Sequence, residues 1–180
     1  MKYRYFAGEA ADLGHVHRLP FDSFAALSEY IVTNPTRLRC TRDEYLALTP
    51  DERDHAKRTR YLVPACFKSS PSPRKAVYAT YCNLLFLDID DHVKARGLLT
   101  QGWNLLAGRD LLVWHTASST EAKPRLRIMV GADEVPIKHY KEAVIELASM
   151  LGVPPTRESL VPVQPMYLPV TFRAAGEEEI

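Results

Sequence analysis

The sequence predicts an α+β fold: an RRM-like (split βαβ) sheet with helices packed on it, preceded by a small, mainly helical N-terminal lobe. Two observations predict this fold class. From residue 76 onward, strand-like and helix-like stretches alternate in the order β-α-β-β-α-β. The first 67 residues instead carry helix caps and a helical spacing of apolar residues.

The N-terminal lobe, residues 1–67, is predicted to contain three helices. Apolar residues recur at helical spacing over 22–33. Two further helix starts are marked by capping boxes, in which a threonine is followed three residues later by a glutamate. These are Thr41 with Glu44, and Thr49 with Glu52. The helix after the second box, 50–60, is almost wholly charged, which favours a solvated surface helix over a nucleic-acid contact.

Residues 68–75 are predicted to be a basic loop or linker, because prolines, serines and cations fill the segment. The sheet domain is expected over 76–175, and 176–180 form an acidic tail. The clearest helix of the sheet domain is 136–151, which begins at a proline and ends before Gly152. The other expected elements are strand 76–90, helix 92–107, strands 111–116 and 126–130, and an edge or irregular strand, 163–170, that contains prolines.

Length and composition bound the class of protein. A chain of 180 residues that is 46% hydrophobic can form one full-sized domain. Its formal net charge of +1 does not indicate nucleic-acid binding by bulk charge, although residues 1–75 are mildly basic. Cys40, Cys66 and Cys82 are far apart, which indicates reduced thiols rather than a disulfide or zinc framework. A cytoplasmic protein without a membrane segment is expected.

Two acids end an apolar stretch of the sequence. Asp88 and Asp90 follow a run of leucines and are two residues apart, so on a strand they project from one face. Two carboxylates so close repel unless a cation compensates them, and oxygen ligands suit Mg²⁺ or Mn²⁺. Such pairs typically support phosphoryl or nucleotidyl transfer through bound metal ions. The alternative is a strand end with solvated acids, because Asp also suits turns and helix caps.

A second polar cluster follows the next predicted strand. A hydroxyl-rich turn with Ser118 and Ser119 leads through Lys123 to Arg125 and Arg127, which share a strand face. Hydroxyls and turn N–H groups can cradle phosphate oxygens, and a guanidinium can bind them bidentately. With the acids, the cluster is typical of a nucleoside triphosphate held between metal ions and arginines. Taken alone, the cluster would be a polar hairpin with solvent-facing arginines.

Three blocks, in this order, resemble the primase–polymerase domain of phage and plasmid replication proteins, within the archaeo-eukaryotic primase superfamily. They read LFLDID from Leu85, TASSTEAKPRLR from Thr116 and QPMYLP from Gln164. The resemblance implies an RRM-like palm with Asp88 and Asp90 as catalytic metal ligands. It further implies template-dependent primer synthesis from nucleoside triphosphates on single-stranded DNA, with Mg or Mn, often beside a helicase domain or subunit. The nucleotide-binding residues it implies are Ser118, Ser119, Lys123, Arg125 and Arg127.

The second and third blocks depart from the family pattern. The turn 118–120 lacks the usual histidine, which His115 could replace only in part. The acid expected in the third block falls on Thr156, with Glu158 two residues on and Asp91 as a further candidate for the third metal ligand. Thr156→Asp is therefore expected to strengthen ion binding if Thr156 occupies the third position. Activity is expected to be low with Mg²⁺ and better with Mn²⁺.

The sequence leaves three functions open. The first is a primase–polymerase-type enzyme of a phage, plasmid or other mobile element. The second is a catalytically silent primase-fold module that binds DNA or a helicase partner; the altered blocks fit either this module or a divergent branch that binds the nucleotide differently. The third is a metal-dependent nuclease or nickase on the same kind of sheet, for which Tyr167 would have to be the nucleophile, although its place beside Pro169 indicates a structural role.

Overall fold

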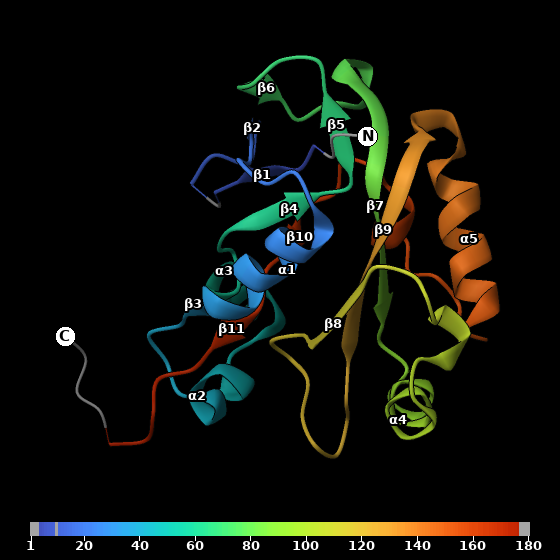
Figure 1. Cartoon of the computed structure of the whole chain (residues 1–180). Helices are drawn as coiled ribbons and strands as arrows, with labels where there is room; N and C mark the ends of the chain where they lie inside the picture. The colour runs from blue at the N-terminus through green and yellow to red at the C-terminus, as the bar shows by residue number, and fades with distance from the viewer. Residues whose placement is uncertain (1–3, 10, 177–180) are drawn as a thin grey trace.

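Two largely antiparallel sheets and the helices around them form the structure, a computed structural model that describes residues 4–9 and 11–176 (Figure 1). The first sheet has four strands in the order β5-β7-β9-β8, and the second has five in the order β10-β4-β1-β2-β6. A parallel pair, β11-β3, forms a third sheet. The mixed α+β class predicted from the sequence is confirmed.

The four-stranded sheet, called the palm sheet below, carries the acidic and basic motifs. Its strands are β5 (Ala65–Phe67), β7 (Ala79–Ile89), β8 (Leu111–His115) and β9 (Leu126–Pro136). β7 and β9 run antiparallel with Asp88 opposite Arg127, and β8 places Trp114 opposite the same Arg127. The two predicted motifs are therefore neighbours across one strand pair.

Different helices cover the two faces of the palm sheet. Helices α4 (His92–Gln101) and α5 (Tyr140–Met150) pack on the face that includes Leu87 and Ile89. Helix α1 (Phe24–Thr33) packs on the other face, at Leu84 and Phe86 (Figure 1). Because side chains alternate along a strand, Asp88 projects on the α1 side, two residues beyond Phe86. The site thus lies where the cover of α1 ends.

The predicted palm helices are present with shortened bounds. Tyr140, Val144, Leu147 and Ala148 form the buried stripe of α5, as the sequence indicated. The first residues of the predicted helix 136–151 form a 3₁₀ turn instead. Helix α4 ends at Gly102, whose φ of +76° suits a glycine at a helix end. The 3₁₀ turns are η1 (Ala76–Tyr78), η2 (Asn104–Leu106), η3 (Ile137–His139) and η4 (Glu158–Leu160).

The N-terminal lobe contains the three predicted helices and, in addition, strands that were not predicted. Its helices are α1, α2 (Arg42–Ala47) and α3 (Pro50–Ala56), and both predicted capping boxes are formed. The same region also supplies three strands of the five-stranded sheet, β1, β2 and β4. The sequence did not predict them, because they are too short to show an alternating pattern. The strands outside the palm sheet are β1 (Phe6–Gly8), β2 (His15–Arg18), β3 (Thr36–Arg37), β4 (Tyr61–Val63), β6 (Ser72–Pro73), β10 (Met166–Tyr167) and β11 (Val170–Thr171).

The RRM-like arrangement is not confirmed in its last strand. The predicted strand 163–170 is reduced to β10, which pairs with β4 rather than with the palm sheet. The place beside β7 is taken by β5, from the N-terminal part of the chain. Prolines explain the short strand, because Pro165 and Pro169 flank β10 and have no N–H to donate to a partner strand.

The basic segment 68–75 is attached to both parts of the chain. The guanidinium of Arg74 donates to the carbonyl oxygen of Leu13 at 2.7 Å and to that of Val163 at 2.7 Å. Ser72 and Pro73 form β6, which pairs with β2. The segment thus contributes a strand to the five-stranded sheet.

The three cysteines are free thiols, and Cys66 and Cys82 are buried. Burial raises the pKa of the Cys66 thiol to about 12, which keeps it protonated and unreactive at neutral pH. Within the described ranges, no helix is both long and apolar enough to cross a bilayer. Most of the predicted acidic tail, 177–180, lies outside the described residues.

Candidate functional site

A cleft of about 390 Å³ opens between the end of the palm sheet and the segment that carries β10. The palm sheet supplies the acids, the arginines and the turn after β8. Helix α3, η4 and β10 supply the opposite wall. The lining residues are Asp54, Lys57, Asp88, Asp90, Trp114, His115, Thr116, Ala117, Ser118, Arg125, Arg127, Glu158, Gln164, Pro165, Met166, Tyr167, Leu168 and Val170.

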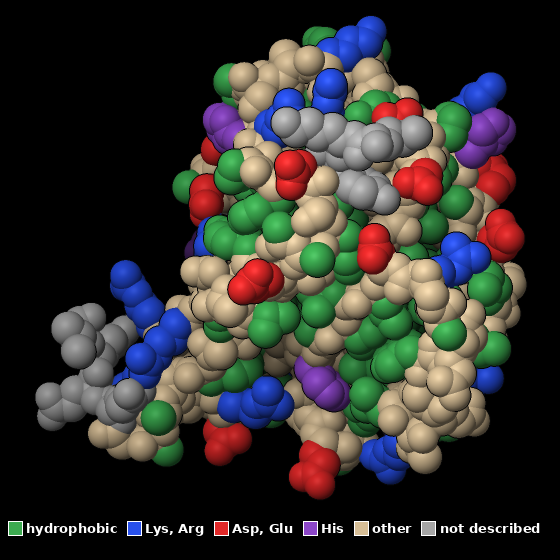
Figure 2. All heavy atoms as spheres, viewed as in Figure 1, with side chains coloured by type: hydrophobic (Ala, Val, Ile, Leu, Met, Phe, Trp, Pro, Cys, Tyr) green, Lys and Arg blue, Asp and Glu red, His purple; other side chains and the backbone are tan. Residues whose placement is uncertain are grey.

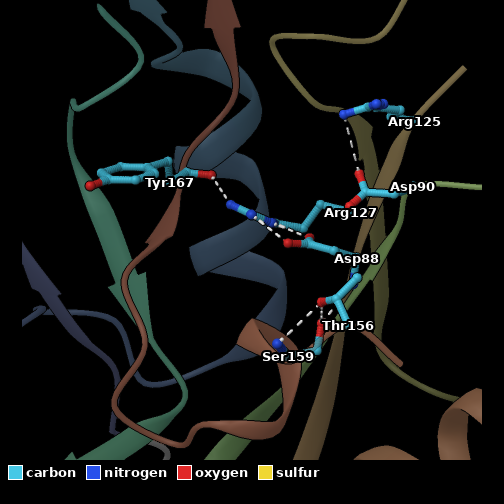
Figure 3. Close-up of polar contacts among 7 residues, drawn as sticks. All are labelled: Asp88, Asp90, Arg125, Arg127, Thr156, Ser159 and Tyr167. Atoms are coloured by element: carbon cyan, nitrogen blue, oxygen red, sulfur yellow. Dashed lines mark hydrogen bonds and ion pairs between the residues drawn. The ribbon is translucent and has the colours of Figure 1, made fainter. Parts of the chain in front are cut away.

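Asp88 and Arg127 form a bidentate ion pair within this cleft (Figure 3). The Nε and Nη2 atoms of Arg127 donate to the two carboxylate oxygens of Asp88 at 2.6 and 2.7 Å. The Nη1 atom donates to the carbonyl oxygen of Tyr167 at 2.8 Å. Both side chains are only 13–14% exposed. Arg127 therefore ties the palm sheet to β10 and already compensates the charge of Asp88.

Asp90 and Arg125 form a much looser pair at the mouth of the cleft. Their closest charged atoms are 3.7 Å apart, and the side chains are 60% and 46% exposed. An exposed pair at this distance is worth little, on the order of 0–1 kcal/mol. In Figure 3, the pair of Asp90 and Arg125 lies above the pair of Asp88 and Arg127. These two side chains are thus the charged groups of the four that a ligand can engage at least cost.

The turn after β8 is held together by Ser119. Its hydroxyl oxygen accepts the backbone N–H of Arg125 at 2.9 Å and lies 2.9 Å from Nδ1 of His115. Its carbonyl oxygen accepts from Nη1 of Arg42 at 2.8 Å. Ser119 is 2% exposed and does not line the cleft, whereas Ser118 does. The hydroxyl-bearing residues of this turn that line the cleft are therefore Thr116 and Ser118.

Thr156 and Glu158, the residues predicted near the third metal-ligand position, have different places in the structure. The hydroxyl of Thr156 lies 2.8 Å from that of Ser159, which accepts the backbone N–H of Asp88 at 2.9 Å (Figure 3). Thr156 thus supports the strand that carries Asp88, and it does not line the cleft. Glu158 does line it.

Asp91 has a different role from the one considered. Its carboxylate caps α4 by accepting the backbone N–H groups of Val93 and Lys94 at 2.9 and 3.1 Å. The hydrogen bond from Lys94, above all, lowers the pKa of this carboxyl. Over residues 4–9 and 11–176, no group of three or more His, Cys, Asp or Glu side chains is placed to hold one ion.

Lys123 lies away from the cleft. Its backbone N–H donates to the hydroxyl of Thr120 within the turn, and the residue is exposed. The predicted nucleotide-binding residues thus divide into three that line the cleft and two that do not. Ser118, Arg125 and Arg127 line it; Ser119 and Lys123 do not.

Several lining residues could not be predicted from the sequence as site residues. Lys57 and Asp54 come from the charged helix α3 and the residue after it, and pair with each other at 3.1 Å. Asp54 also pairs with Arg58 at 2.8 Å, and these hydrogen bonds, Arg58 first, lower the pKa of its carboxyl. No signal in the sequence places this helix at the cleft. Trp114 did carry a signal, because it precedes the polar turn on a strand.

Tyr167 contributes its backbone to the site. Figure 3 shows its ring directed away from the acids while its carbonyl oxygen meets Arg127. The ring packs against Tyr61 with centroids 6.2 Å apart, and burial raises the pKa of the phenol. This geometry does not favour a tyrosine nucleophile of the nickase kind.

On the face shown in Figure 2, Lys and Arg side chains are scattered rather than gathered into one basic stripe. This distribution matches the near-neutral net charge of +1. On this face, an anionic ligand would therefore meet separate cations rather than one large basic surface.

Comparison with known proteins adds one structural match. No protein-family model and no curated protein matches the sequence. Among solved structures, the AEP domain of the cyanophage S-2L primase–polymerase (PrimPol) matches with a TM-score of 0.38 and 15% sequence identity. The match covers 93% of this chain and 72% of that one. Because this TM-score is low, fold and function are inferred from the residues of this chain.

Proposed function

We propose that the chain binds a nucleoside triphosphate with Mg²⁺ or Mn²⁺ in this cleft and carries out template-dependent nucleotidyl transfer of the primase–polymerase kind. Its setting would be DNA replication of a phage, plasmid or other mobile element, on single-stranded DNA and beside a helicase domain or subunit. One observation carries the proposal. Acids at the end of β7 and arginines at the start of β9 converge on one cleft with the hydroxyl turn after β8.

The acidic side of the cleft suits a hard divalent ion in the kind of donor it offers. Asp90 and Glu158 are exposed carboxylates that line the cleft, and oxygen is the ligand that Mg²⁺ and Mn²⁺ prefer. Asp88 is the less available carboxylate, because both its oxygens already accept hydrogen bonds from the guanidinium of Arg127, whose positive charge disfavours a second cation nearby. A bound divalent ion would supply charge compensation to the triphosphate and polarise the reacting oxygens.

The basic side of the cleft suits phosphate oxygens. Arg125 is half exposed and only weakly paired, so its planar fork of N–H donors can turn to a phosphate. Ser118 adds a hydroxyl on the same wall, and Lys57 adds a point charge from the opposite one. A triphosphate would then lie between Arg125 and the ion held by Asp90.

The test is primer synthesis on single-stranded DNA with Mn²⁺ and nucleoside triphosphates. Asp90→Asn is expected to lower the rate by about 100-fold or more, the equivalent of a few kcal/mol of transition-state stabilisation. Asp90 is the better target than Asp88, since replacing Asp88 would also leave Arg127 unpaired. Asp22→Asn, an exposed acid outside the cleft, is the matched control. Equal activity of Asp90→Asn and the parent would refute the site.

A second function, the catalytically silent module, is favoured by a specific observation. Arg127 occupies the carboxylate of Asp88, and the described residues provide no complete group of three ligands for an ion. Such a module would bind single-stranded DNA without a metal ion, and its affinity would fall steeply with salt as counterions are released. Binding that is unchanged by Mn²⁺, together with no primer synthesis, would support this second function over the first.

A further inference from the structure

Trp114 is an aromatic side chain on the cleft wall that the proposed chemistry does not use. It lies on β8 opposite Arg127, two residues before the polar turn, and is partly buried. We propose that Trp114 is the surface on which the base of the bound nucleotide stacks. This inference rests on the proposed function and extends it from the triphosphate to the nucleoside.

Strand alternation explains why this indole faces the cleft. Leu112 and Trp114 pack against the cluster that contains Phe86 and Met129, on the α1 side of the palm sheet. Asp88 lies two residues after Phe86 on β7, and Arg127 lies two residues before Met129 on β9. Both therefore project on that same side. The apolar cover of this face thus ends at Trp114, where the ion pair and the open cleft begin.

Packing holds the indole in place from one side. The rings of Phe86 and Trp114 meet in a T-shaped contact, with centroids 6.4 Å apart and an interplanar angle of 86°. A ring fixed in this way loses little further conformational freedom when a ligand stacks on it. No hydrogen bond joins the indole N–H to another group in the described part of the chain, and the N–H is not among its buried unpaired groups. The indole N–H of Trp114 is therefore not fully buried, on a residue that lines the cleft.

The position of Trp114 suits a base whose phosphates reach Arg125. Trp114 lies opposite Arg127 on the neighbouring strand. Arg125 is two residues before Arg127, a distance of roughly 7 Å along an extended backbone. The sugar of a nucleotide separates its base and phosphates by a span of this order. Every base has a π face, so stacking on Trp114 would bind the four bases with little discrimination.

The tryptophan content makes a direct test possible, because the chain has two tryptophans, Trp103 and Trp114. Trp103 follows α4 and packs with the α4–α5 cluster on the other face of the palm sheet. In Trp103→Phe, Trp114 is the sole indole reporter. Titration with deoxyadenosine triphosphate in the presence of Mn²⁺ is expected to quench its fluorescence saturably. Inorganic triphosphate, which has no base, is expected to bind without that quench.

Affinity measurements on Trp114 variants complete the test. Trp114→Leu keeps an apolar contact with Phe86 but removes the stacking surface, and calorimetric affinity for the nucleotide is expected to fall about ten-fold or more. Affinity for inorganic triphosphate is expected to stay within about two-fold, since the Arg125 side is unchanged. Trp114→Phe keeps an aromatic ring and is expected to retain most of the nucleotide affinity, which would separate stacking from a loss of folding.

The outcomes separate the two proposals. If inorganic triphosphate binds but the nucleotide binds no tighter, or if Trp114→Leu binds the nucleotide as the parent does, the stacking role is overturned while the phosphate site stands. If neither ligand binds the parent with Mn²⁺, the proposed function itself fails, and the stacking role fails with it.

Discussion

At the scale of single residues, Arg127 decides how the acidic motif can be used. Its three guanidinium nitrogens donate to the two oxygens of Asp88 and to the carbonyl oxygen of Tyr167. The guanidinium of Arg127 therefore acts first as a brace, a structural link between β7, β9 and β10, and only second as a candidate phosphate ligand. Arg125, with a single contact at 3.7 Å, is the more available cation. Two arginines at matching positions of one motif thus differ in role because their burial differs.

The brace can be tested by removing the fork while keeping the charge. In Arg127→Lys, an ammonium cannot reach both oxygens of Asp88 and the carbonyl of Tyr167 together. We expect the free energy of unfolding in urea to fall by about 1–3 kcal/mol, less than for a fully buried pair because both groups retain some exposure. Arg125→Lys is the matched control and is expected to change stability by less than about 0.5 kcal/mol. Equal effects of the two variants would show that Arg127 is no brace.

The third metal ligand can be tested at two neighbouring residues. Glu158 lines the cleft, whereas the hydroxyl of Thr156 bonds to Ser159 behind the strand of Asp88. We therefore expect Glu158→Gln to weaken Mn²⁺ binding by roughly ten-fold, because one carboxylate is lost from the donor set. Thr156→Asp is expected to leave Mn²⁺ affinity no higher than in the parent. Calorimetric titration of Mn²⁺ measures both, and a clear gain from Thr156→Asp would restore Thr156 to the third position.

At the scale of elements, local signals in the sequence predicted what local contacts determine. The capping boxes of α2 and α3 are formed as expected, because each joins residues only three positions apart. The apolar run before Asp88 likewise predicted a strand with the acids at its end, where β7 ends. The pairing of β10 with β4 and of β5 with β7 depends on β4, β5 and β10, which have only two or three residues each and show no periodicity of their own. The wall of the cleft that those pairings build was for the same reason beyond prediction.

One capping box carries a pH dependence of stability. Glu44 accepts the backbone N–H of Thr41 and pairs with Arg173, and these contacts, the Thr41 bond first, lower the pKa of its carboxyl below the usual 4.5. A carboxyl whose pKa is lower in the folded than in the unfolded state stabilises the fold at pH values above its unfolded-state pKa. That stabilisation is lost as the pH falls through the pKa of the folded state. Glu44→Gln keeps a capping acceptor but no charge.

We therefore expect the melting temperature of Glu44→Gln to lie below that of the parent at pH 7. The difference is expected to shrink as the pH is lowered from 5 towards 3, because the parent then loses its charge as well. Thermal melts followed by circular dichroism measure it, with Glu146→Gln on the exposed side of α5 as the control. A difference that stays constant over this range would exclude the charge of Glu44 as its cause.

At the scale of the whole molecule, the cleft exists only because the two main sheets are joined. β4 and β5 are separated by one residue, yet β4 belongs to the five-stranded sheet and β5 to the palm sheet. β10 returns from the palm side to pair with β4, and Arg127 binds the carbonyl oxygen of Tyr167 within it. The predicted division at 68–75 therefore crosses both sheets, and the palm sheet owes one edge and one covered face to residues before it.

Removal of the first 75 residues tests this dependence. A fragment of residues 76–175 would lose β5 from the edge of β7, and it would lose the cover that α1 provides to Leu84 and Phe86. An unpaired edge and an exposed apolar face favour association over folding. We expect the fragment to aggregate or to lack a cooperative thermal transition, whereas the whole chain unfolds in one transition. Tryptophan fluorescence and far-ultraviolet circular dichroism should report that single transition at the same midpoint. A fragment that melts cooperatively near the temperature of the whole chain would show that the palm sheet is a separate domain.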